Sequence, residues 1–95
     1  MPAYLFTFVK AFTESAKEYG IEEGLVKELA LNAIIGSCEL ALKSDESLDE
    51  LIDSVCSRGG ATIAGLDKMK QEGLTKAIKE GYKACINRSK ELSHD

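Results

Sequence analysis

The stretch that decides the fold is EEGLVKELALNAIIGSCELALK, residues 22–43. It contains no proline, and its apolar residues recur three and four positions apart, which predicts one long helix. Two stripes of apolar and small residues run along it: Leu25, Leu29, Ala33, Gly36 and Leu40 form one, and Val26, Ala30, Ile34, Ser37 and Ala41 form the other. Together they are wider than the roughly 100° apolar face of an ordinary surface helix. We therefore expect this helix to be buried on more than one side, against a second subunit.

Helical patterns fill the rest of the 95-residue chain, whose only proline is Pro2. We expect four further helices, over residues 3–19, 48–55, 62–71 and 75–93. A chain of this length makes one domain and often gains stability from a partner. The sequence therefore predicts a single all-α domain of five helices, without linkers or repeats.

The ends of these helices carry recognisable signals. Pro2 suits a first helical turn, Gly20 and Gly73 suit helix ends, and Ser47 with Glu50 forms a capping box. The periodicity also predicts an inner face for each helix. Its members are Tyr4, Leu5, Phe8, Val9, Phe12 and Ala16; Leu48, Leu51, Ile52 and Val55; Ile63, Leu66 and Met69; and Leu74, Ile78, Tyr82, Cys85 and Leu92.

Composition excludes several classes of protein. The net charge of −4, with acidic and basic residues interleaved, argues against binding to nucleic acid or to a membrane surface. Cys38, Cys56 and Cys85 are odd in number and widely spaced, and the only histidine is His94 near the end of the chain. This pattern predicts no metal site and a reducing, cytoplasmic location. It also leaves no serine–histidine–aspartate set.

The run Ser57-Arg58-Gly59-Gly60-Ala61-Thr62 is the candidate binding motif. Glycine permits a left-handed backbone and close approach of a ligand. Successive amides at the start of the next helix then suit a carboxylate or a phosphate. The alternative is a plain glycine turn in which Thr62 caps the helix.

Several motifs resemble one known family. Pro2-Ala3-Tyr4-Leu5-Phe6 resembles a Pro-Ala-Tyr-x-Phe opening, and the stretch from Val55 to Ile63 resembles a Val-x-Ser-Pro-Gly-Gly-(Thr/Ala)-Thr signature. The positions Gly20-Ile21, Leu29-Ala30 and Gly36, and the closing Ala84 and Arg88-Ser89-Lys90-Glu91-Leu92, extend the likeness over the whole chain. On these motifs the chain resembles the C-terminal domain of pyrroline-5-carboxylate reductase.

The resemblance implies a fold and an activity. The expected fold is an interwoven all-helical homodimer, like the C-terminal domain of 6-phosphogluconate dehydrogenase, and dimers of this kind can assemble further. The expected reaction is reduction of 1-pyrroline-5-carboxylate to L-proline with NAD(P)H. The cofactor would be held mainly by an N-terminal Rossmann domain, because this chain has no Gly-x-Gly-x-x-Gly motif. We therefore expect residues 1–95 to be a piece of a longer enzyme, divided at a domain boundary and inactive alone.

The resemblance also implies roles for residues. Ser57, Gly59, Gly60, Ala61 and Thr62 would hold the substrate carboxylate, and the Thr62 hydroxyl would lie near the ring nitrogen as the catalytic group. No residue of this chain is expected to bind the cofactor or a metal.

Five residues depart from the family pattern. Arg58 replaces a proline and either contacts the anion or points to water. Lys10 and Lys83 stand where many relatives carry an acid, and Ser47-Leu48 replaces a His-Pro joint. These changes keep open a divergent imino-acid reductase. Two further alternatives are a non-enzymatic helical dimerisation module and a redox sensor that uses Cys56.

Overall fold

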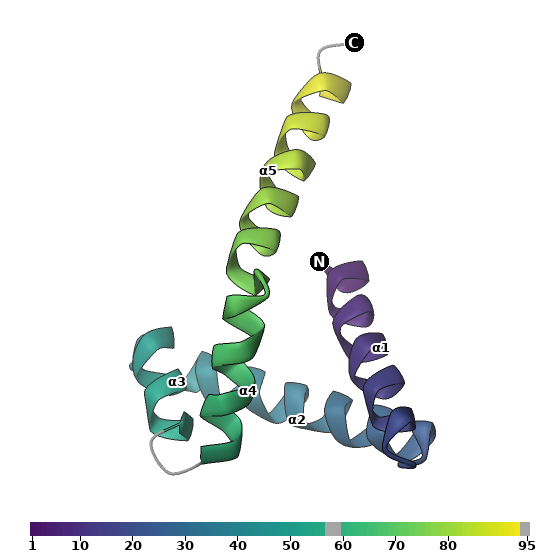
Figure 1. Cartoon of the computed structure of the whole chain (residues 1–95). Coiled ribbons are helices and arrows are strands. Elements are labelled where there is room, and N and C mark those ends of the chain that lie inside the picture. The colour runs from purple at the N-terminus through teal and green to yellow at the C-terminus, as the bar shows by residue number, and fades with distance from the viewer. Residues whose placement is uncertain (57–59, 94–95) are drawn as a thin grey trace. The chain divides into compact units, whose positions relative to one another are not determined.

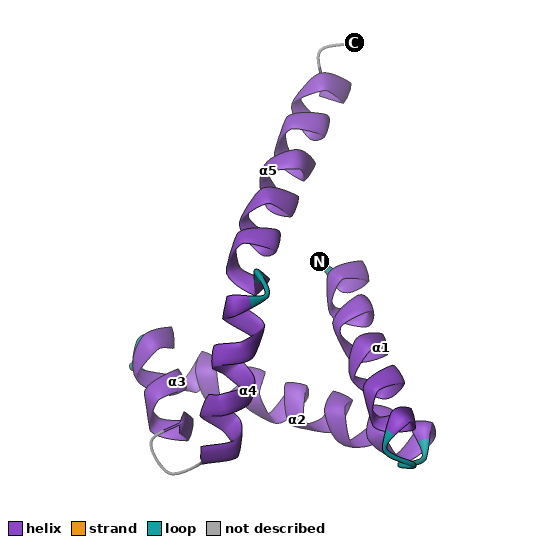
Figure 2. Ribbon diagram, in the orientation of Figure 1, coloured by secondary structure: helices purple, strands orange, loops and turns teal. Residues whose placement is uncertain are grey.

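The computed structural model describes residues 1–56 and 60–93 of the chain. Every regular element in these residues is a helix, as Figure 2 shows. The bounds are α1 Pro2–Glu18, α2 Glu23–Lys43, α3 Leu48–Cys56, α4 Gly60–Gln71 and α5 Leu74–Ser93. The predicted all-α class is confirmed. Four helices begin and end within one residue of the predicted bounds, and α4 begins two residues earlier.

The chain divides into two compact units, Met1–Leu48 and Asp49–Asp95. In the first unit, α1 packs on α2, and the two helices diverge from the turn between them (Figure 1). In the second unit, α4 contacts α5, and the two helices follow one another in nearly the same direction (Figure 1). None of the described helices is long and apolar enough to cross a membrane.

The turn between α1 and α2 is fixed by two backbone hydrogen bonds, donated by the N–H groups of Gly20 and Ile21. Gly20 has a φ of +75°, its N–H donates to the Lys17 carbonyl at 3.0 Å, and the Ile21 N–H donates to the Ala16 carbonyl at 3.0 Å. This pair of bonds is a Schellman motif, which satisfies carbonyls left open at a helix end. The prediction that Gly20 ends the first helix is confirmed.

Glu72 and Gly73 join α4 to α5, and Gly73 has the left-handed backbone of this joint. Gly73 has a φ of +99°, and its N–H donates to the Lys70 carbonyl at 3.0 Å. Its own carbonyl accepts from the Ala77 N–H at 2.8 Å, in the first turn of α5. Gly73 therefore closes one helix and opens the next.

Burial within the chain is far lower than the inner faces predicted. Val9, 6% exposed, is the buried residue among those that the structure describes. Half-buried positions on the predicted inner faces are Ala16, Leu51, Leu66, Met69 and Leu74. The others are exposed: Tyr4, Leu5, Phe8, Phe12, Leu48, Ile52, Val55, Ile63, Ile78, Tyr82, Cys85 and Leu92. Their predicted burial is wrong for the single chain, because each unit has too few helices to cover these faces.

The two stripes of α2 differ in their surroundings. Val26, Ala30, Ile34 and Ala41 of the second stripe are half-buried, whereas every member of the first stripe is exposed. One side of α2 is therefore used inside the chain. The Leu25–Leu40 side has no cover in the described residues.

Substitution of Gly20 tests the left-handed turn. We expect Gly20→Ala to lower the free energy of unfolding by about 1–2 kcal/mol, because an L-residue is strained at positive φ. The matched change Gly65→Ala lies inside α4, where a Cβ meets no atom within 4 Å. It should raise the free energy of unfolding by up to about 1 kcal/mol. Urea unfolding followed by circular dichroism at fixed protein concentration measures both, and equal effects would contradict the assignment.

Candidate functional site

The candidate site lies at the beginning of α4. Gly60, Ala61 and Thr62 are the first three residues of this helix, and all three are exposed. The first N–H groups of an α-helix have no acceptor within the helix, and the positive end of its dipole lies there. This end of α4 therefore offers the donors and the electric field that a small anion requires.

Gly60 is the first residue of α4, and no atom lies close to the place where a side chain would be. The described glycines with positive φ are Gly20 and Gly73, and Gly60 has joined the helix. A Cβ built on Gly60 would meet no atom within 4 Å. Gly60 therefore lies in the first turn of α4, and the left-handed backbone that the sequence suggested for the glycine pair stays a prediction.

Thr62 does not cap the helix. The alternative of a plain turn placed Thr62 at the cap, but α4 begins at Gly60 and Thr62 is its third residue. That position corrects the predicted start at residue 62. The side chain is therefore carried on a regular helical turn with fixed backbone dihedrals.

Three members of the predicted site lie outside the described residues. They are Ser57, Arg58 and Gly59. Their contacts with a carboxylate stay predictions, as does the choice between an anion contact and a solvated position for Arg58.

The charges of α4 lie away from the candidate site. Its first turn contains no acidic residue, and its basic residues Lys68 and Lys70 are in the last turn. Lys68 forms an ion pair with Glu72 at 3.1 Å, just beyond the C-terminal end of α4. No acidic side chain of α4 itself therefore opposes an anion at its N-terminal end.

Cys56 is the last residue of α3 and is half-buried, and all three cysteines are unpaired. Among residues 1–56 and 60–93, no three side chains of the ligating types gather as a metal site would require. The described residues therefore supply neither a redox pair nor a metal centre.

A surface hollow at the corner of α1 and α2 was not predicted from the sequence. It is lined by Lys10, Thr13, Glu14, Lys17, Glu18 and Glu23. Lys17 pairs with Glu23 at 3.4 Å, and Lys10 pairs with Glu14 at 3.8 Å on its own helix. The Lys10 pair is thus within α1 rather than between helices. The mixed charges of this hollow favour no particular ligand.

Comparison with known proteins gives one consistent family. Residues 1–92 match the family model described as pyrroline-5-carboxylate reductase dimerisation. A pyrroline-5-carboxylate reductase of Staphylococcus epidermidis is 36% identical over 93 residues, which cover 98% of this chain and 34% of the relative. The pyrroline-5-carboxylate reductase of Escherichia coli is 33% identical over 92 residues, which cover 97% of this chain and 34% of the relative.

The chain thus spans about a third of the length of these relatives. No solved structure gives a significant match. The family model nevertheless covers almost every residue, including the opening motif, the glycine run and α5. The chain therefore belongs to the pyrroline-5-carboxylate reductase dimerisation family.

Proposed function

We propose that residues 1–95 form the C-terminal dimerisation and substrate-binding domain of a pyrroline-5-carboxylate reductase. The reaction is the NAD(P)H-dependent reduction of 1-pyrroline-5-carboxylate to L-proline, a step of proline biosynthesis in the cytoplasm. The observation that carries this proposal is the match over 98% of the chain to a reductase of that name. The isolated chain is inactive, because it supplies only part of the site.

The cofactor belongs to a part of the protein outside this chain. Dinucleotide sites of the Rossmann type need a strand, a glycine-rich turn and a helix, and the described residues contain no strand. When bound by such a domain, NAD(P)H supplies the hydride for the C=N carbon of the substrate. The residues of this chain act on the other groups of the substrate.

The beginning of α4 holds the carboxylate in this proposal. The amides of Gly60, Ala61 and Thr62 donate to it, and Ser57 and Gly59 complete the contact. When hydride adds to the C=N carbon, the ring nitrogen would take up one proton from water to become an amine. The Thr62 hydroxyl lies at that nitrogen and orients it for proton uptake. The exposure of all three α4 residues supports these roles.

The exposed apolar faces support a homodimer. Tyr4, Phe8 and Phe12 on α1 and the Leu25–Leu40 stripe on α2 are exposed in the single chain. Exposed apolar side chains at helical spacing on two neighbouring helices are typical of an interaction site. A second copy of the chain covers it, in accordance with the name of the family.

Reconstitution tests the proposed activity. The chain is joined to the dinucleotide-binding domain of a reductase relative. The resulting protein should oxidise NAD(P)H only when 1-pyrroline-5-carboxylate is added. The isolated chain serves as the control and should show no turnover. A well-folded two-domain protein without activity would contradict the reductase assignment and leave the divergent imino-acid reductase as the alternative.

Thr62→Ala separates catalysis from folding. In the same two-domain protein, we expect a clear fall in kcat, because the hydroxyl at the ring nitrogen is lost. The free energy of unfolding should change by less than about 0.7 kcal/mol, since alanine is the better helix former. Thr75→Ala, an exposed threonine near the start of α5, is the matched control and should leave kcat unchanged. Equal kcat values for the two variants would contradict a catalytic role for Thr62.

Sedimentation equilibrium tests the oligomer. We expect the chain to have twice its 10.3 kDa mass or a higher multiple. Its midpoint of thermal unfolding should rise with protein concentration, because association stabilises the folded state. A monomer mass at high micromolar concentration would contradict the proposed dimer.

A further inference from the structure

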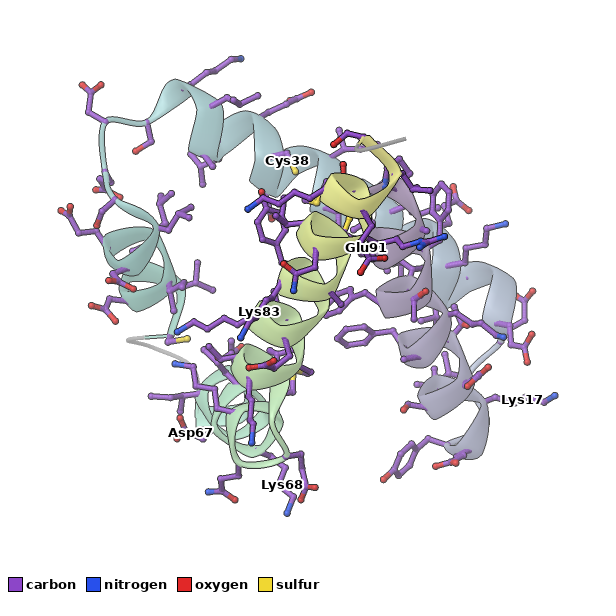
Figure 3. All side chains as sticks on the ribbon, turned by 90° about the horizontal axis from the view of Figure 1, so that it is seen from above. Lys17, Cys38, Asp67, Lys68, Lys83 and Glu91 are labelled. Carbon is purple, nitrogen blue, oxygen red and sulfur yellow. The ribbon has the colours of Figure 1, made fainter. Side chains whose placement is uncertain are left out.

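Four lysines form a row along α5. They are Lys76, Lys79, Lys83 and Lys90, and all four are exposed. At about 100° and 1.5 Å per residue, they lie within an arc of about 60° and along about 21 Å of the helix. Acidic and basic residues are interleaved in the sequence of α5, but the turn of the helix gathers these lysines on one side. Figure 3 shows the side chains along α5, with Lys83 labelled.

The lysine row has no acidic partner within the described part of the chain. None of its four members is ion-paired with another described residue. Lys76 and Lys79 lie three positions apart, and Lys79 and Lys83 lie four apart. Because like charges at these spacings repel one another on a helix, the row destabilises α5 unless an acidic partner faces it.

The two borders of the lysine row restrict the width of such a partner. Glu80 and Glu91 lie on one border, about 40–60° around the helix from Lys76. Ile86 and Tyr82 lie on the other border and are 37% and 61% exposed. A broad polyanion that covered the row would also meet the glutamates, which repel it. The row therefore fits a narrow rod with acidic and apolar residues side by side, which is the surface of an acidic amphipathic helix.

Two other kinds of polyanion fit the row less well. Single-stranded nucleic acid is held by aromatic side chains as well as by cations, and the lysine row contains no aromatic residue. A flat lipid surface meets both borders of an apolar helix side, but the lysines lie on one border only. On the other border, Arg88 is already paired with Glu91 at 2.9 Å.

The described helices of a second copy do not supply the acidic row. Four acids are needed to face the four lysines, and none of these helices contains more than three acidic residues. α3 contains Asp49, Glu50 and Asp53, but its nine residues span only about 13 Å. The partner that the row fits is therefore a different protein.

We propose that the lysine row of α5 binds an amphipathic helix of another protein, whose acidic residues recur three and four positions apart. These acids pair with the lysines, and apolar residues beside them contact Tyr82 and Ile86. Lysine forms such pairs as a flexible point charge, so the spacing of the charges determines which helix fits. The proposal is independent of the reductase reaction and of the dimer.

Binding of a designed peptide tests the proposal. The probe is a fluorescein-labelled, alanine-based helix with glutamates three and four positions apart along one side and leucines beside them. We expect fluorescence anisotropy to show binding that weakens at least about 10-fold as NaCl is raised from about 50 mM to about 300 mM, because salt screens exposed charges. A control peptide of the same composition, with its glutamates spread around the helix, should bind at least about 10-fold more weakly than the probe at the lower salt concentration.

Charge-reversal variants of the full chain locate the binding surface. The double variant Lys79→Glu/Lys83→Glu should bind the probe at least about 10-fold more weakly, since two attractions become repulsions. The matched control Lys27→Glu/Lys43→Glu makes the same change of net charge on exposed lysines of α2 and should keep nearly the native affinity. Lys79→Arg/Lys83→Arg keeps the charges and should also bind as the native chain does. Circular dichroism confirms that each variant is helical.

Three outcomes would overturn the proposal. The first is equal binding of the two peptides, and the second is equal affinity of the two charge-reversal variants for the probe. The third is tighter binding of the native chain to single-stranded oligothymidylate or to phosphatidylglycerol vesicles than to the probe, because the row would then be a general polyanion surface.

Discussion

The shortage of helices in each unit is the constraint on which the rest depends. In Met1–Leu48 one helix faces one neighbour, and in Asp49–Asp95 α4 and α5 meet chiefly at the short joint between them. A helix with a single neighbour is covered on one side at most. Full burial of a leucine or isoleucine side chain contributes about 1.5–3 kcal/mol to the free energy of folding. Because the stripes are exposed, the single chain lacks much of this stabilisation. In the proposed dimer, a second copy of the chain would cover these stripes and recover this stabilisation.

This constraint explains what the sequence could predict and what it could not. Helix periodicity, Pro2 and Gly20 are local signals, and they located four helices to within one residue. Burial is not a local property. The spacing of Ile78, Tyr82 and Leu92 shows which side of α5 avoids water, but it does not show which molecule covers that side. The two apolar stripes of α2 were the clearest sign in the sequence that the chain alone leaves an apolar side uncovered. A helix with one neighbour buries only one such side.

The candidate site, too, could be predicted from the sequence only in part. The glycine run predicted an anion-binding position from its chemistry, and this position stays a prediction, although the family match covers the run. The exact start of α4 could not be predicted, since glycine has a poor helix propensity and residue 60 was expected in a loop. In the structure Gly60 is helical and Thr62 is carried on the first turn. Thr62 is thus positioned by regular backbone geometry rather than by a cap.

Gly73 lies in the joint between α4 and α5 in the second unit. α4 carries the candidate site at its far end, about 18 Å from the joint by helical rise, and α5 carries an exposed apolar side. A rotation of about 5° at this one left-handed glycine displaces the first turn of α4 by about 1.6 Å, given that lever length. A displacement near 1 Å is enough to cost an enzyme about two orders of magnitude in rate. Any change in the backbone angles of Glu72 and Gly73 would therefore move the first turn of α4, which carries Thr62, relative to α5.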